Sequence, residues 1–357
     1  MSTHRRLVAP GQLIAGEGVL EAAQASGAAT AGLPDVPLAE FAIQHGLRPS
    51  AERPPVPRYL QQLWQRRHFI LGFATARNVA LYTEARLGQA WQLLTPLFNA
   101  GVYFLVFGLL LKINRGVPNY LGFLVTGVFV FNFTQTVFIS TSSVIPENLE
   151  LIRALRFPRA ALPLGYVIIQ LEQMLLSMVV LAVVVVATGE PVTWYWLLAI
   201  PALLLQTMFN VGVGLACARI GSSVNDFSQL MPFLMRTWLY VSGVIFEIST
   251  LAVGPVYKVI LQVNPAAVYI SLMREAMLQS QRISQPGAKP YNKALCQEWS
   301  TVGHRTGVAA KYQELSAYCH PSINPGHYWY YAIAWAVVAL VVGFWFFWRA
   351  ETRYGRG

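Results

Sequence analysis

Acidic side chains that could transfer protons are few and scattered in this sequence. Glu147 and Glu150 stand three residues apart on one face of a short predicted helix, and we expect that face to be solvated rather than catalytic. Glu172 is the only acidic residue deep within an apolar segment. It is either a proton site or, as we favour, a carboxylate hydrogen-bonded to a neighbouring helix, through Gln173 or a hydroxyl group. None of these residues forms the acid–base cluster of a catalytic centre.

Histidine and cysteine give no metal-binding pattern either. Three histidines share one polar stretch, residues 279–327, without a nearby cluster of carboxylates: His304, His320 and His327. The cysteines lack C-x-x-C spacing. We predict a disulfide between Cys296 and Cys319, with two free thiols as the alternative, and a buried thiol at Cys217. The nucleotide-binding pattern G-x-x-x-x-G-K-[ST] is absent, so we expect no cofactor and no metal on this chain.

The composition indicates which kind of protein must hold these residues. Of the 357 residues, 55% are hydrophobic and only 12% are charged, whereas soluble domains carry about 25% charged residues. The apolar surplus must face something other than water, and lipid is the simplest candidate. The net charge of +10 would suit nucleic acid, but the arginines flank apolar segments, which favours a role in membrane topology and headgroup binding.

Six apolar segments are long enough to cross a bilayer. They are residues 87–111 (with the helix starting near Pro96), 120–141, 160–188, 191–218, 232–249 and 328–348. Residues 251–278 are apolar but interrupted, and we expect two re-entrant half-helices there. The sequence therefore predicts an all-α integral membrane protein with six transmembrane helices, located in the inner (plasma) membrane.

The distribution of basic residues predicts the orientation of these helices. Most arginines near the helix ends fall on the side that holds both termini, and the short opposite loops carry only Lys112 and Arg115. Both termini should therefore be cytoplasmic, including a tail over residues 351–357. The loop at 279–327 should lie outside.

Two segments precede the first transmembrane helix. Residues 1–57 are rich in Ala, Gly and Pro, and we expect a largely disordered extension. Residues 58–86 combine basic residues with an apolar stripe at helical spacing that includes Leu60, Leu63 and Trp64. This pattern predicts an amphipathic helix in the membrane interface, with a helix docked on protein as the alternative. Gly88 and Pro96 should set the turn from this helix into helix one.

The loop between predicted helices two and three is the strongest candidate for a contact with another protein. It forms a short helix that Pro158 should end, with apolar residues on one side and arginines around them. The residues that we expect to couple to a partner are Leu149, Ile152, Arg153, Arg156, Phe157, Pro158 and Arg159, with Leu155 in the same apolar group. The alternative is a helix lying flat on lipid.

The sequence resembles a known family at three places in order. These are the L-I…F-P-R…L-P-L pattern within Asn148–Leu164; Arg86, Gly88, Trp91 and Pro96 at the entry to helix one; and Asn264-Pro265 followed by Arg274. Ser242–Ile245 fits as well. The resemblance spans about residues 59–350 and is to ABC-2 type transporter permeases of the Wzm-like group, which export O-antigen and teichoic acid.

This resemblance implies a homodimer that works with two copies of a separate ATPase, so that ATP and Mg²⁺ belong to the partner. Its substrate would be a lipid-linked polysaccharide, such as an actinobacterial galactan. The pore would lie between protomers, lined mainly by helices one and five. Aromatic residues on these helices could stack on sugar rings: Phe98, Tyr103, Phe107, Trp238, Tyr240 and Phe246. The alternatives are an ABC-2 drug or small-lipid exporter and, in another class, a membrane-embedded glycosyl- or acyltransferase.

Overall fold

The computed structural model describes residues 54–82, 88–110, 119–155, 157–224, 226–248, 255–278 and 325–351, together with Tyr354. They all fall in one compact unit, Pro54–Gly357, which is separate from Met1–Arg53. Every regular element in these ranges is a helix, which confirms the all-α prediction. The predicted extension, Lys112, Arg115, the 279–327 loop and the cysteines within that loop lie outside the described residues, apart from a few residues at the borders of these segments.

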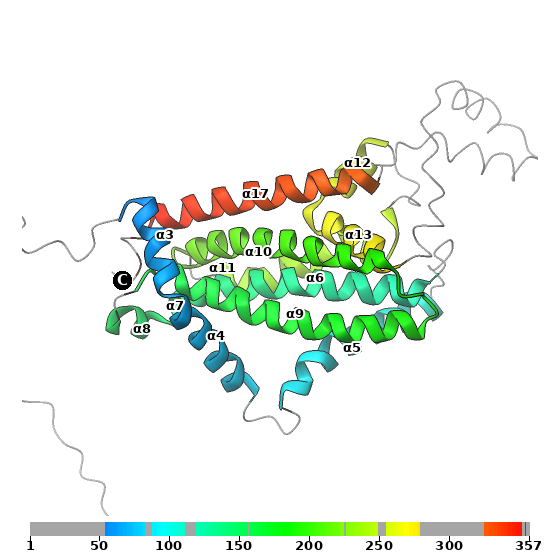
Figure 1. Cartoon of the computed structure of the whole chain (residues 1–357), viewed down its shortest axis with the longest axis horizontal. Coiled ribbons are helices and arrows are strands. Elements are labelled where there is room, and N and C mark those ends of the chain that lie inside the picture. Colours follow the sequence, from blue (N-terminus) through cyan, green and yellow to red (C-terminus); the bar gives the residue numbers. More distant parts are fainter. Residues whose placement is uncertain are drawn as a thin grey trace, which may run out of the picture. The chain divides into compact units, whose positions relative to one another are not determined.

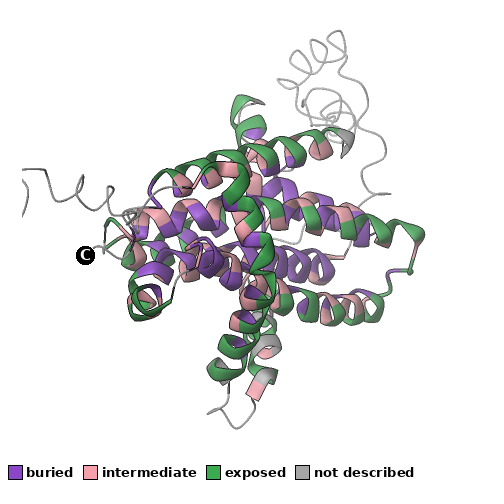
Figure 2. Ribbon diagram, turned by 60° about the vertical axis from the view of Figure 1, so that its left-hand side comes forward, coloured by how far each residue is buried: buried purple, intermediate pink, exposed green. Residues whose placement is uncertain are grey.

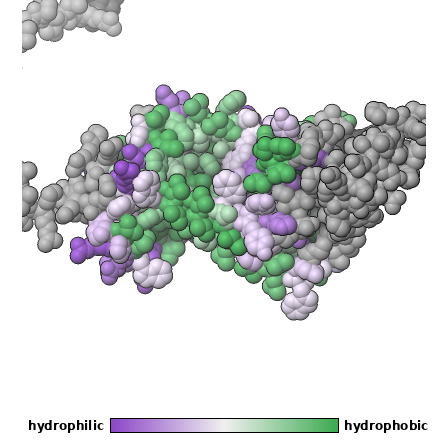
Figure 3. Space-filling view, turned by 90° about the horizontal axis from the view of Figure 1, so that it is seen from above, coloured by the Kyte–Doolittle hydropathy of each residue, from purple (hydrophilic) through white to green (hydrophobic). Residues whose placement is uncertain are grey.

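Four helices in the described ranges are long and apolar enough to cross a membrane. They are α6 (Tyr120–Ser142), α9 (Ala161–Ala187), α10 (Ala199–Gly221) with the preceding η4 (Trp194–Leu198), and α17 (Pro325–Arg349). These helices confirm predicted spans two, three, four and six, and they lie side by side in Figure 1. Buried residues face inward between them and exposed apolar residues face outward (Figure 2). Seen from the α17 side, the surface is an apolar band bordered by hydrophilic residues at one end (Figure 3).

The other two predicted spans differ from the expected helices. The first runs through η2 (Gly88–Ala90), α5 (Trp91–Tyr103) and the π-helix η3 (Phe104–Leu110). Because α5 already begins at Trp91, the prediction that Pro96 lies in the first turn is wrong. Pro96 stands inside α5, where proline removes a main-chain hydrogen bond and crowds the preceding turn. The second is α11 (Phe227–Val241), which begins and ends earlier than the predicted 232–249. Its 15 residues span about 22 Å, less than the bilayer core of about 30 Å.

The predicted half-helices are present as α12 (Pro255–Val263) and α13 (Pro265–Met277), which meet at an angle of 77°. The polar groups at the bend form hydrogen bonds with other groups of the protein. Asn264 Oδ1 accepts hydrogen bonds from the Ala266 N–H (3.2 Å) and from Trp238 Nε1 (2.9 Å). Trp335 Nε1 donates to the Val263 carbonyl at 2.8 Å. A bent pair of this kind is tolerated at membrane depth because its exposed main-chain groups have partners.

A buried arginine explains why α11 ends early. Arg274 of α13 donates to the carbonyl oxygens of Phe123 (3.1 Å), Gly243 (2.9 Å) and Val244 (2.8 Å). Gly243 also has a positive φ of 71°, which suits glycine and ends the helical path. The guanidinium lies 3.3 Å from the centre of the Phe123 ring. Arg274 thus supplies the donors that the carbonyl groups beyond α11 would otherwise lack.

The predicted interface helix is two helices rather than one: α3 (Val56–Gln65) and α4 (Arg67–Tyr82). The chain changes direction at Arg66 because α4 packs against α9, where Gly165 leaves room for the ring of Phe73. α3 buries one face, with Tyr59 and Leu63, and exposes Leu60 and Trp64 on the other. The alternative of a helix docked on protein therefore holds for one face of α3, and its placement in the membrane interface stays a prediction.

α10 and α17 share the most extensive contact of any helix pair in the described unit. A Cβ atom on Gly212 would collide with the main chain of Ala339 and Leu340, and one on Gly343 would collide with the main chain of Gly212. Only glycine permits main chains to approach this closely. This seam, Gly212 with Gly343 and their neighbours, fixes the two helices against one another.

Candidate functional site

The segment predicted to meet a partner consists of α7 (Val144–Glu147) and α8 (Leu149–Ala154). α8 ends at Ala154, so the prediction that Pro158 ends this helix is wrong: the chain is already extended at Leu155, and buried Pro158 lies in the turn before α9. Figure 1 places α7 and α8 at the same end of the unit as α3.

The apolar residues of this segment are less accessible than the sequence suggested. Ile152 is buried and Leu149 is half-buried. Phe157 is half-buried, and its ring lies 5.1 Å from that of Phe69 on α4, measured between ring centres. Leu155 and Arg153 remain exposed. Phe157 and Ile152 therefore attach the segment to the rest of the chain, whereas Leu155 and Arg153 face outward.

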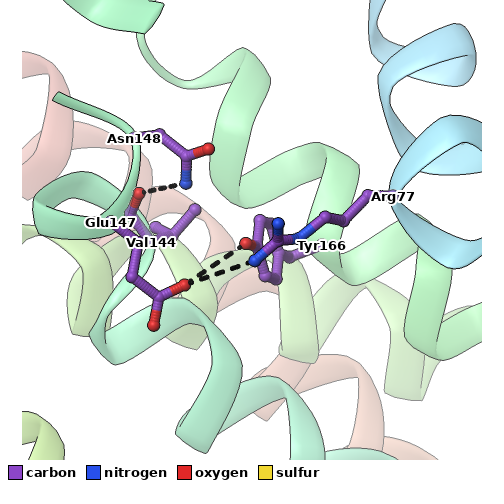
Figure 4. Close-up of polar contacts among 5 residues, drawn as sticks. All are labelled: Arg77, Val144, Glu147, Asn148 and Tyr166. Atoms are coloured by element: carbon purple, nitrogen blue, oxygen red, sulfur yellow. Dashed lines mark hydrogen bonds and ion pairs between the residues drawn. The ribbon is translucent and has the colours of Figure 1, made fainter. Parts of the chain in front are cut away.

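Side chains from three helices meet beside α7 (Figure 4). Glu147 Oε2 lies 3.8 Å from Arg77 of α4 and accepts a long hydrogen bond of 3.5 Å from the hydroxyl of Tyr166 on α9. Asn148 Nδ2 donates to the Val144 carbonyl at 2.8 Å. The Arg77–Glu147 pair is about half-exposed, so it contributes little stability. It does place the end of α7 against both α4 and α9.

A second polar cluster joins the two ends of the described unit. The Tyr59 hydroxyl donates to Glu351 Oε2 at 2.8 Å and accepts from the Ala160 N–H at 3.2 Å. Glu351 Oε1 accepts from the Arg159 N–H at 3.0 Å, and the Arg159 guanidinium donates to the Glu351 carbonyl. Burial, and next the nearby Glu351, raises the pKa of Tyr59 well above its ordinary value. Burial likewise raises the pKa of Glu351. Arg159 therefore has a partner within this chain, contrary to its expected role at the surface.

The same end carries one further link. Trp348 Nε1, near the end of α17, donates to the Pro54 carbonyl at 3.0 Å. Together with Tyr59 and Glu351, this bond ties α3, the entry to α9 and the end of α17 together. We call these contacts the Tyr59–Glu351 knot.

The interpretation that we favoured for Glu172 is confirmed. Its Oε2 atom accepts a hydrogen bond of 3.0 Å from Asn78 Nδ2 on α4, a neighbouring helix. The donor is an amide, not the Gln173 side chain or a hydroxyl group. Cys217 is a buried thiol, also as predicted.

The turn that leads into helix one contains Gly88, as the sequence predicted. Gly88 has φ +50°, a left-handed conformation that favours glycine. Trp91 begins α5 and is exposed. Arg86, Arg156 and the Cys296–Cys319 pair lie outside the described residues, as does the side chain of Pro96.

Of the six aromatic residues predicted to line the pore, four pack within the described unit and two are exposed. Trp238 packs edge-on against Phe131 (5.9 Å between ring centres) and Phe138 (5.5 Å), so it belongs to the packing between α11 and α6. Tyr103, Phe107 and Phe246 are half-buried against the core of the bundle. Phe98 of α5 and Tyr240 of α11 are exposed.

Comparison with known proteins identifies the family. A family model described as "ABC-2 type transporter" matches residues 71–278. The chain belongs to the ABC-2 type transporter family. It is therefore a multi-pass membrane protein, and the matched range runs from within α4 to the end of α13.

Two similar curated relatives of this ABC-2 chain carry the same name, "O-antigen export system permease protein RfbA". The Myxococcus xanthus protein is 26% identical over 235 residues, which is 65% of this chain and 88% of the relative. The Klebsiella pneumoniae protein is 23% identical over 198 residues, covering 55% of this chain and 75% of the relative.

Sequence reasoning missed two sets of buried polar contacts in the described part of this ABC-2 chain. Tyr59 and Glu351 are 292 residues apart, and no local pattern could have paired them. Arg274 was noticed only as part of a resemblance, although a basic residue within an apolar segment is itself a signal that its charge must be satisfied.

Proposed function

We propose that this chain is the transmembrane subunit of an ABC exporter that moves a lipid-linked polysaccharide from the cytoplasm to the outer face of the membrane. A separate ATPase that binds ATP and Mg²⁺ powers the transport. The observation that carries the substrate class is the similarity to two O-antigen export permeases over most of their length. Two copies of the chain and two copies of the ATPase make up the exporter.

The proposed topology has six passes, with α5–η3 and α11 as the shorter ones and α12–α13 as a re-entrant pair. Both termini are cytoplasmic, and α3 lies in the membrane interface. The supporting observation is that Arg153, Arg219 and Arg349 belong to α8 and to the ends of α10 and α17, which gather with α3 at one end of the unit (Figure 1). Basic residues favour the cytoplasmic side. Tags at residues 1 and 357 should resist an external protease in intact cells, and cleavage of both would contradict this topology.

In this proposal the ATPase couples to the chain by contact with α8 and with Leu155, which directly follows it. The exposed Leu155 and Arg153 meet the partner, and Phe157 transmits the push because its ring rests on Phe69 of α4. The knot ties the entry of α9, at Arg159 and Ala160, to α3 and to the end of α17. Displacement of α8 would therefore move several helix ends together.

The function is tested by reconstitution with the ATPase encoded next to this chain's gene. The complex should export a lipid-linked polysaccharide, and its ATP hydrolysis should rise when that substrate is added. Stimulation by small amphiphilic drugs alone would favour a drug or small-lipid exporter. Chemical change of the glycan by the chain without the ATPase would instead indicate a transferase.

Two variants separate binding of the ATPase at α8 from the coupling of its ATP hydrolysis to export. Leu155→Ala should weaken association with the ATPase by about tenfold, since apolar anchors at interfaces cost 1 kcal/mol or more. Phe157→Ala should preserve more of the association but uncouple hydrolysis from export, because it frees α8 from α4. Pull-down of the ATPase and export are measured in parallel. Parent-like values for both variants would show that the partner docks elsewhere.

A further inference from the structure

The interface between α6 and α10 contains buried amide groups whose hydrogen-bonding capacity the described part of the chain does not satisfy. Gln206 and Asn210 of α10 are 1% and 0% exposed. Four buried side-chain atoms in the described ranges have no hydrogen-bond partner there: Gln206 Oε1, Asn210 Nδ2, Asn210 Oδ1 and, away from them in η4, Trp196 Nε1. Buried polar atoms normally bind either protein or ordered water. Three such atoms on two neighbouring side chains therefore point to a ligand.

Both amides lie on the side of α10 that packs against α6, its neighbour in Figure 1. Gln206 Nε2 donates to the Val130 carbonyl at 2.8 Å and to the Thr134 hydroxyl at 3.0 Å. Further along α10, a Cβ atom on Gly214 would lie 3.3 Å from Cγ2 of Thr141, again on α6. Asn210 stands between Gln206 and Gly214, four residues from each, and residues at this spacing share one face of a helix.

The two amides are far from either membrane surface. The membrane span Trp194–Gly221 has 28 residues, and its midpoint falls between Gln206 and Asn210. Asn210 is 11 residues from the end of α10 at Gly221, or about 16 Å along the axis. Lipid tails offer no hydrogen bonds at this depth, so the partner of these atoms must come from within the bundle.

The supply of donors and acceptors shows which kind of partner is required. An amide side chain has two N–H donors and one oxygen acceptor. The N–H donors of Gln206 serve Val130 and Thr134, so none is left for Asn210 Oδ1. A direct bond from Asn210 Nδ2 to Gln206 Oε1 would satisfy those two atoms and still leave Asn210 Oδ1 without a donor. The partner must therefore both donate and accept hydrogen bonds.

Water has this chemistry and the right size. Buried water molecules typically make about three hydrogen bonds to polar groups that otherwise lack partners. A cation is a poorer match, because it needs a shell of oxygen ligands and the N–H donors of Asn210 Nδ2 would face it.

We propose that at least one water molecule binds between Gln206 and Asn210 and joins α10 to α6 at the centre of the membrane. It extends by one turn of α10 the contact that Gln206 makes directly with Val130 and Thr134. This inference goes beyond the proposed function, since the water site does not depend on what the chain exports.

The first test is a cryo-electron-microscopy map of the full chain in phosphatidylcholine nanodiscs, with a bound antibody fragment to increase its size. At a resolution that shows ordered water, the map should contain a separate peak within hydrogen-bond distance of the Gln206 and Asn210 amides. A direct contact between the two amides with no third peak would overturn the proposal.

The second test uses the sign of a change in Tm. Asn210→Leu loses the bonds to water and leaves Gln206 Oε1 without a donor, so its Tm should fall below that of the parent. The double variant Gln206→Leu with Asn210→Leu should lower the Tm by less than the sum of the two single changes, because both share one ligand. Thr207→Val is the control on the same helix: its hydroxyl donates only to the Leu203 carbonyl of α10, and its Tm should match that of the parent.

Two further outcomes would contradict the water site. A higher Tm for Asn210→Leu would mean that the amide is buried without any partner, since replacing such a group by an apolar one is favourable. A parent Tm that is higher in sodium chloride than in choline chloride at equal ionic strength would mean that a cation occupies the site.

Discussion

The seam between α10 and α17 and the outer faces of α5 and α11 are opposite solutions to packing in a membrane. At the seam, Gly212 and Gly343 bring two main chains into direct contact. On α5 and α11, large residues such as Phe98 and Phe233 are left uncovered. Lipid tails are as apolar as leucine, so burial of apolar area does little to hold helices together in a bilayer, whereas close contact does. The seam is thus the rigid part of the protein, and the α5–α11 face is the part free to meet another molecule.

Overpacking the seam should have the largest effect. Gly343→Leu has no space against the main chain of Gly212, and we expect a loss of about 3 kcal/mol or more, seen as little monodisperse protein in detergent. Gly101→Leu on α5 is the matched control, since a Cβ atom there meets nothing within 4 Å, and it should be recovered like the parent. Equal yields of the two variants would remove the contrast between seam and face.

Replacing Arg274, which donates hydrogen bonds to the carbonyl groups just beyond α11, should have the second-largest effect. Arg274→Met leaves the buried carbonyl groups of Gly243 and Val244 without the donors that Arg274 supplies, which should cost about 3 kcal/mol and lower the Tm in detergent. Arg58→Met, at an exposed position of α3, should leave the Tm unchanged. A parent-like Tm for Arg274→Met would show that α11 is held by its contacts with α6 alone.

The turn before α5 should be more tolerant. Gly88→Val places a β-branched residue at φ +50°, which costs about 1–2 kcal/mol, with no clash to add because nothing lies within 4 Å of the site. We expect reduced export from this variant and near-parent export from Gly88→Asn, since asparagine adopts this conformation more readily. Full export by Gly88→Val would place the critical turn elsewhere.

The smallest predicted effect is the pH dependence of stability at the Tyr59–Glu351 knot. Because burial raises the pKa of Glu351 in the folded chain, the carboxyl group favours folding in its protonated form. Its contribution is complete below the unfolded pKa of about 4.3 and is lost as the pH rises through the folded pKa. The Tm of the parent should therefore fall more between mildly acidic and neutral pH than that of Glu351→Gln. Parallel pH profiles would show that the donors around Glu351 compensate for its burial.

The sequence predicted the elements whose signal is local. Apolar length located α6, α9, α10 and α17, and residue type identified the left-handed turn at Gly88. It did not predict where α11 ends, because Arg274 on another element sets that end. It also treated Arg159 and Phe157 as surface residues, although contacts with Glu351 and Phe69 hold them inward. Hydropathy measures how much a segment prefers lipid, but it does not say which distant side chain donates a hydrogen bond to a carbonyl group or packs against an aromatic ring.

The hydrogen bond from Trp348 to Pro54 has a consequence for engineering the chain. The described unit begins and ends at one point, and domains whose ends meet can be joined there and cut elsewhere. A short peptide from the end of α17 to the start of α3 would close the chain into a ring. A new opening between α9 and η4, where Pro191 and Val192 are exposed, would preserve every helix of the unit. Such a circular permutant would place a reporter or an affinity handle at the end of the bundle opposite the knot, leaving the coupling segment untouched.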